Sequence, residues 1–172
     1  MFADEILLQI GALESSLADL YQWYSEILAS DSEVSRVFSM MSEEEKTHAS
    51  LVEYSRRLVR SDLAFSSEVE FEVAGIKAVL EKVLALRKTP VPPTADQAIQ
   101  LTLWLEMTTA DDHSRNRTSL KKGNPGLARL LKALASEDLV HFGRVMELAR
   151  RRGIRVPASA GDSPDGEPLS IP

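Results

Sequence analysis

Two stretches of the chain resemble each other: Met41-Ser-Glu-Glu-Glu-Lys-Thr-His48 and Leu134-Ala-Ser-Glu-Asp-Leu-Val-His141. They start 93 residues apart, and each places an acidic residue three positions before a histidine. Each acid also follows a single glutamate by 31 or 32 residues: Glu45 follows Glu14, and Asp138 follows Glu106. Because both glutamates lie in apolar helical patterns, the sequence predicts a helical hairpin that occurs twice.

Helical geometry places the acid and the histidine of each motif inside the apolar stripe of its helix. At about 100° per residue, Glu45 lies about 40° to one side of Met41, and His48 lies about 20° to the other side. The second motif repeats these angles around Leu134. Carboxylates and imidazoles are costly to bury without a counter-charge, and two divalent metal ions would balance four carboxylates.

The acids also fall at matching heights along the predicted hairpins. Glu14 and Glu45 lie roughly 22 and 20 Å of helix from the first turn, and the acids of the second hairpin are similarly placed. An alternative is that Ser42 to Glu45 forms a capping box within an ordinary solvated acidic face. Two copies with matching upstream glutamates favour a metal site in a helix bundle.

Composition limits the class of protein. The 172 residues suit one domain, and 44% apolar with 27% charged residues is typical of a soluble globular chain. A net charge of −6 argues against nucleic acid or an anionic membrane surface as a partner. The start of the chain lacks the features of a signal peptide, so we expect a cytoplasmic location. Without cysteine, any metal must be held by nitrogen and oxygen ligands.

Apolar periodicity predicts an all-α protein with four long helices. They run from about Ala3 to Ala29, from the Asp31-Ser32 turn to about Arg60, from the Thr94 cap to a turn near Lys121, and from the turn at 123–126 to Gly153. The connection at 62–93 contains one further amphipathic segment. We therefore expect a helical domain at residues 1–152 and a flexible tail rich in proline and glycine at 153–172.

The motifs Glu14-x6-Tyr21, Glu45-x-x-His48, Glu106 and Asp138-x-x-His141 resemble the ferritin-like superfamily, particularly its rubrerythrin-like branch. The resemblance covers residues 3 to about 152. It implies a ferritin-like four-helix bundle, built from two hairpins with a long crossover that contains a further short helix. It also implies a carboxylate-bridged di-iron centre with Tyr21 as a catalytic residue beside it. The metal ligands that it implies are Glu14, Glu45, His48, Glu106, Asp138 and His141. The alternative for Tyr21, taken as a single residue, is an ordinary core side chain.

The chain departs from the family pattern in two places. Asp138 stands where glutamate is usual, so its shorter side chain could leave one metal position loose or let Glu137 replace it. Rubrerythrins also carry a cysteine-ligated rubredoxin domain, and this chain has no cysteine, so that electron relay is missing.

Three further residues in these helices need an interpretation. His113 follows Glu106 as Tyr21 follows Glu14, so it could orient a ligand or serve as an extra ligand. Its polar neighbours favour an exposed helix end instead. Trp23 and Trp104 lie off the ligand faces, and we expect them to be packing or interface residues.

The expected cofactors are two Fe ions, with Mn as a competitor, because two imidazoles and four carboxylates suit both metals. The expected function is oxidation of Fe(II) by dioxygen or peroxide, as a ferroxidase or peroxidase in iron handling or oxidative-stress defence. One alternative is a di-iron hydroxylase or oxygenase with an apolar substrate pocket. Another is a metal-free helical scaffold or cargo protein.

The expected partners follow from the same resemblance. We expect a homo-oligomer, a dimer or larger, and a peroxidase would need an external electron donor. The final segment, residues 166–172, resembles peptides that load ferritin-like cargo into encapsulin shells. The alternative is an unstructured end with a few apolar residues.

Overall fold

The computed structural model describes residues 1–61, 68–120 and 124–154, and it is all-helical apart from one isolated bridge between Phe2 and Glu68. Five helices follow one another: α1 (Ala3–Ile27), α2 (Ser32–Ser61), α3 (Ala74–Leu86), α4 (Ala95–Leu120) and α5 (Pro125–Arg151). The all-α prediction is confirmed. In the part of the chain described, no helix combines the length and the apolar character needed to cross a membrane. The predicted tail lies outside the described residues from position 155 onward.

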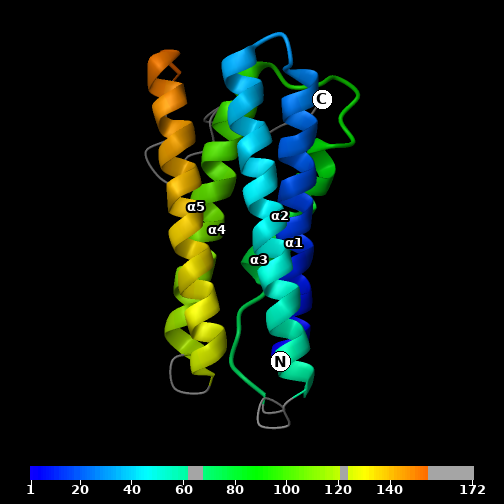
Figure 1. Cartoon of the computed structure of the whole chain (residues 1–172), viewed down its shortest axis with the longest axis vertical. Coiled ribbons are helices and arrows are strands. Elements are labelled where there is room, and N and C mark those ends of the chain that lie inside the picture. Colours follow the sequence, from blue (N-terminus) through cyan, green and yellow to red (C-terminus); the bar gives the residue numbers. More distant parts are fainter. Residues whose placement is uncertain (62–67, 121–123, 155–172) are drawn as a thin grey trace.

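The four long helices form two antiparallel pairs that run side by side along the long axis (Figure 1). Helix α1 packs against α2, and α4 packs against α5. The pairs meet through contacts of α2 with α5, while α3 packs against both α1 and α4. Because α2 ends at the opposite end of the molecule from the start of α4, the connection that contains α3 travels along the bundle (Figure 1). The further amphipathic segment predicted in this connection forms helix α3.

Polar side chains and one glycine set the helix ends where the sequence predicts them. The carboxylate of Asp31 accepts from the N–H of Val34 at 3.2 Å and starts α2. Thr94 and Gln97 form a reciprocal capping box at the start of α4, with bonds of 2.9 and 3.3 Å. After α5, Gly153 has a φ of +67°, a conformation that favours glycine and ends the helix.

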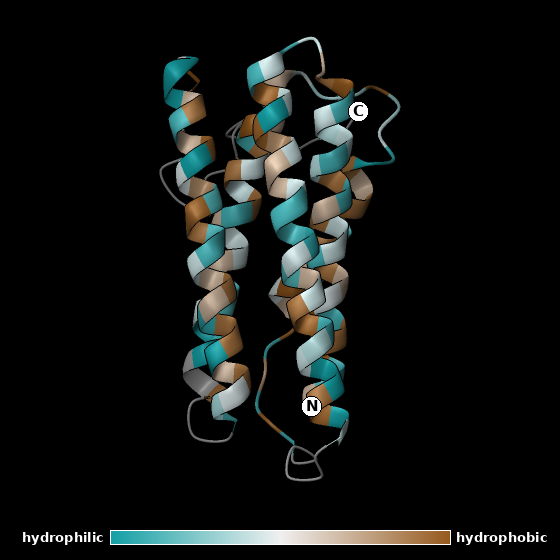
Figure 2. Cartoon of the chain, in the orientation of Figure 1, coloured by the Kyte–Doolittle hydropathy of each residue, from teal (hydrophilic) through white to brown (hydrophobic). Residues whose placement is uncertain are grey.

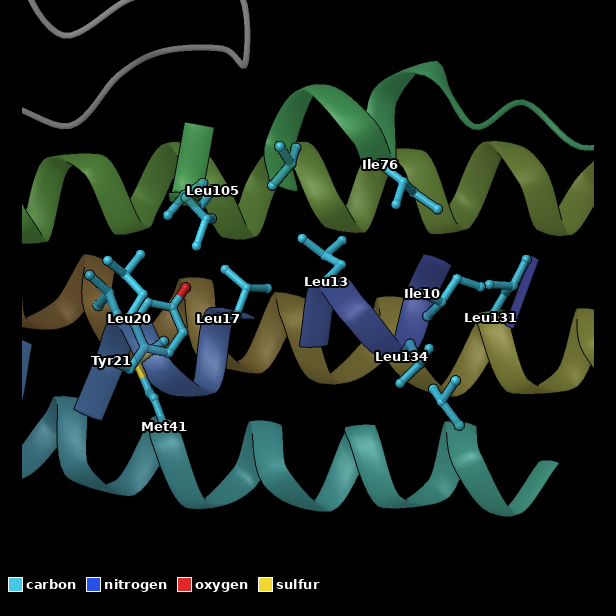
Figure 3. Packing of buried hydrophobic residues seen from close by; sticks show 14 of the residues in the cluster. Ile10, Leu13, Leu17, Leu20, Tyr21, Met41, Ile76, Leu105, Leu131 and Leu134 are labelled. Atoms are coloured by element: carbon cyan, nitrogen blue, oxygen red, sulfur yellow. The ribbon is translucent and has the colours of Figure 1, made fainter. Parts of the chain in front are cut away.

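The apolar face of each helix is directed inward, as the periodicity predicts. Hydrophobic and hydrophilic residues alternate around the long helices in Figure 2. Figure 3 shows side chains from α1, α2, α3, α4 and α5 converging on a shared interior, with Leu13 and Leu17 of α1 among them. Trp23 and Trp104 are partly buried against this core, so their predicted packing role is confirmed. Glu14 lies between Leu13 and Leu17 in the sequence and is equally buried.

Helix α3 is held against α4 by close polar contacts at its start. The side chain of Asn116 donates to the backbone oxygen of Glu72 at 3.0 Å and accepts from its N–H at 2.8 Å. One turn earlier, the buried carboxylate of Asp112 approaches Gly75 so closely that an added Cβ would lie 1.9 Å from its Oδ2 atom. A side chain at position 75 would therefore force the carboxylate of Asp112 to move.

Gly75→Ala should lower the free energy of unfolding by about 1–3 kcal/mol, because Asp112 would have to leave its buried position. Gly143→Ala is the matched control, since Gly143 is also helical but a Cβ there would meet nothing within 4 Å. That change should raise stability by about 0.5–1 kcal/mol through helix propensity. Urea denaturation measures both, and equal effects of the two substitutions would contradict the proposed packing at Gly75.

Candidate metal centre

Six predicted ligands from four helices lie in one buried region. Each has at most 1% of its surface exposed, except His48 at 7%. Helix α1 contributes one carboxylate, α2 a carboxylate and an imidazole, α4 one carboxylate, and α5 a carboxylate and an imidazole. Five of the six belong to two groups whose ligand atoms are close enough to share an ion: Glu14, Glu45 and His48 in the first, and Glu45, Glu106 and His141 in the second.

The first group places its imidazole nitrogen between two carboxylates. The Nδ1 atom of His48 lies 3.0 Å from Oε2 of Glu45 and 3.6 Å from Oε2 of Glu14. Two ligand atoms that lie about 2.1 Å from one ion, at about 90° to each other, are about 3.0 Å apart. The separations therefore match those of ligands around a single metal ion.

The second group repeats this geometry. The Nδ1 atom of His141 lies 3.0 Å from Oε1 of Glu45 and 3.5 Å from Oε2 of Glu106. Glu45 thus presents one carboxylate oxygen to each group. The rings of His48 and His141 stack at 5.5 Å between centroids, and Glu45 lies in position to bridge two ions.

Burial and mutual contact shift the pKa values of these groups in opposite directions. Burial raises the pKa of Glu14 to about 7 and also raises the pKa of Glu106. Although burial opposes the charged imidazole, contacts with Glu14 and Glu45 raise the pKa of His48 to about 10. Burial likewise opposes charge on His141, but Glu106 and Glu45 raise its pKa to about 11. Without metal, both imidazoles therefore hold protons that partly neutralise the carboxylates.

Several of the buried ligand atoms make no hydrogen bond to any described residue. They are both carboxylate oxygens of Glu14, Oε1 of Glu45, Oε2 of Glu106, Oδ1 of Asp138 and both ring nitrogens of His141. A buried polar group that stays unpaired costs about 1–3 kcal/mol, and a charged group costs more. Cations bound between the carboxylate oxygens and Nδ1 of His141 would satisfy those atoms. Carboxylate with imidazole is a donor set that Fe(II) and Mn(II) accept. The residues present therefore fit a two-ion site.

Asp138 is buried beside the two groups but belongs to neither. Its Oδ2 atom lies 2.9 Å from Nδ1 of His113, and burial raises its pKa well above the usual value. The role of Asp138 as a metal ligand therefore stays a prediction. Glu137, the alternative acid, is exposed.

His113 is completely buried, so the preferred interpretation of an exposed helix end is wrong. Its Nδ1 atom contacts Asp138, and its Nε2 atom lies 3.9 Å from Oε1 of Glu14. The polar neighbours predict exposure, but Asp111 and Ser114 face solvent on a different side of the helix from His113. The seven-residue spacing from Glu106 does indicate burial, because it places His113 and Glu106 on one face of the helix.

Tyr21 lies beside the second group and is also completely buried. Its hydroxyl donates a short hydrogen bond to Oε1 of Glu106. In Figure 3 this hydroxyl points away from Met41 of α2. The contact with a candidate ligand agrees with the predicted position of Tyr21, while its catalytic role stays a prediction.

The run of three glutamates on α2 has three different environments. Glu43 is exposed and pairs with Lys46 at 2.6 Å. Glu44 is half-buried, and Glu45 has no exposed surface. The solvated-face interpretation is therefore correct for Glu43 and wrong for Glu45.

Comparison of the chain with protein-family models, with curated proteins and with solved structures found no match. Only the geometry of this site therefore bears on function.

Metal affinity should rise with pH between about pH 6 and pH 9, because each ion must displace the proton of an imidazole. Both histidine pKa values, about 10 and about 11, lie above this range, so proton competition weakens steadily as pH rises. Calorimetric titration with Mn(II) in buffers of different ionisation enthalpy should detect at least one proton released per ion near neutral pH, because both imidazoles and part of Glu14 hold protons there. A pH-independent affinity with no proton release would contradict ligation by these imidazoles.

Proposed function

We propose that this chain is a ferritin-like, rubrerythrin-like di-iron protein that oxidises Fe(II) with dioxygen or peroxide. Its cellular role would be iron handling or defence against oxidative stress. The observation that carries the proposal is the pair of buried carboxylate–imidazole groups that share Glu45. The two helix pairs, joined by a long connection along the bundle, are compatible with ferritin-like topology.

The two carboxylate–imidazole groups indicate how two ions would be held. Glu14 and His48 would bind one ion, Glu106 and His141 would bind the other, and Glu45 would bridge them. Asp138 remains a proposed further ligand. Fe is the metal that we propose, and Mn is the competitor that the same donor set accepts.

When bound, a pair of iron ions supplies two electrons to one oxidant. Two Fe(II) each lose one electron, and dioxygen takes up both electrons with two protons to give hydrogen peroxide. With hydrogen peroxide as oxidant, the same electrons and two protons give two water molecules. Fe(II) is the electron donor as well as the substrate, so this reaction needs no cysteine relay.

The side chains favour this reaction through charge and burial. Anionic carboxylates stabilise Fe(III) more than Fe(II), which makes the bound iron a better electron donor. Tyr21 restrains the carboxylate of Glu106 through its hydrogen bond. The surrounding apolar side chains strengthen these electrostatic interactions because they exclude water.

Stopped-flow mixing of apo-protein and two equivalents of Fe(II) with oxygen or peroxide should give a rapid rise in near-ultraviolet absorbance. Glu45→Ala should slow this rise to the rate in buffer, because it removes the carboxylate shared by both groups. Glu43→Ala should leave the rate unchanged, since that glutamate is exposed and lies only two positions away.

A wild-type rate no faster than buffer with either oxidant would reject the proposal. If metal still bound, a di-iron hydroxylase would become the better explanation. If no metal bound, a metal-free scaffold would be the better explanation.

A further inference from the structure

A second charged contact lies behind His141, on the side of the ring away from the shared Glu45. The Nε2 atom of His141 is 3.1 Å from Oε2 of Glu44, whereas its Nδ1 atom faces Glu45 and Glu106. The two ring nitrogens therefore face different carboxylates. His141 has no exposed surface, so solvent does not compete for Nε2.

Glu44 is itself held by an arginine from the other helix pair. The guanidinium of Arg144 forms a two-pronged ion pair with both carboxylate oxygens of Glu44, and one of the two bonds measures 3.0 Å. Through this contact, Arg144 lowers the pKa of Glu44 although partial burial opposes the shift. Two parallel N–H···O bonds fix the plane of a carboxylate as well as its position.

His48 lacks an equivalent support. Its Nδ1 atom contacts Glu14 and Glu45, but no described residue forms a hydrogen bond or ion pair with its Nε2 atom. Its side chain is also slightly exposed, at 9%, where that of His141 is not. The two imidazoles thus occupy similar positions around Glu45 and differ in what lies behind them.

We propose that Glu44 and Arg144 are positioning residues that orient His141 for metal binding. Because His48 has no such support, the two metal positions differ in affinity. This inference rests on the proposed two-ion site. The carboxylate of Glu44, 3.1 Å from Nε2, favours a proton on that nitrogen and so leaves the lone pair of Nδ1 for the ion. Its negative charge also makes the imidazole a stronger ligand.

The ion pair also links the two helix pairs beside the site. Glu44 immediately precedes the shared Glu45 on α2, and Arg144 follows His141 by one turn on α5. This ion pair therefore helps to hold Glu45 of α2 next to His141 of α5. The ion at His141 is bound more tightly than the ion at His48, and the second position is the one that exchanges substrate iron.

Anaerobic Co(II) titration of the full chain, followed by visible absorbance, tests this inference in two backgrounds. His48→Ala leaves the His141 position, and there Glu44→Ala should weaken the remaining ion about ten- to hundredfold. His141→Ala leaves the His48 position, and there Glu44→Ala should leave the affinity unchanged. Arg144→Gln should weaken the His141 position in the same direction.

Glu43→Gln is the control for a lost negative charge on the same helix, and it should change neither affinity. Glu44→Gln keeps the side-chain shape and serves as the second variant if Glu44→Ala unfolds, which circular dichroism reports. Unchanged affinity at the His141 position in the folded Glu44 variants, or equal loss at both positions, overturns the inference while metal binding itself stands. Failure of the wild type to bind Co(II) overturns the inference together with the proposed two-ion site.

Discussion

The structure depends on one electrostatic constraint: buried carboxylates must be neutralised inside an apolar helical core. Glu14, Glu45 and Glu106 have at most 1% of their surface exposed, and apolar side chains surround them. Two protonated imidazoles offset this charge only in part, and several oxygens stay unpaired among the described residues. A cation in each group would remove the imbalance, because it attracts every one of these oxygens at once.

The arrangement of the helices places candidate ligands from four helices at one level of the bundle, where a cation could neutralise them. In each pair, residues at about the same distance from the connection between the two helices lie beside each other. Glu14 and Glu45 are an example. Contacts between α2 and α5 then bring Glu45 and His141 together although they are far apart in the sequence. The Glu44–Arg144 ion pair lies in the same interface, so assembly of the helix pairs and orientation of His141 are coupled.

Much of this could be predicted because it follows from local periodicity. The apolar stripe shows that Glu45 and His48 face inward, and the caps at Asp31 and Thr94 fix where α2 and α4 begin. Contacts that depend on packing between helices could not be predicted. The polar neighbours of His113 predict an exposed helix end, whereas the packed helices bury it completely. The contact of Asp138 with His113 arises only when α5 packs against α4, and the contact of Arg144 with Glu44 arises only when the two pairs dock.

The proposed site holds two metal ions on either side of one shared carboxylate, that of Glu45. Anomalous X-ray scattering at the iron absorption edge, from crystals of Fe(II)-loaded protein, tests it directly. We expect two anomalous peaks per chain, one beside His48 and one beside His141, with the carboxylate of Glu45 between them. No peak in this region, or peaks only at exposed surface carboxylates, would contradict the account.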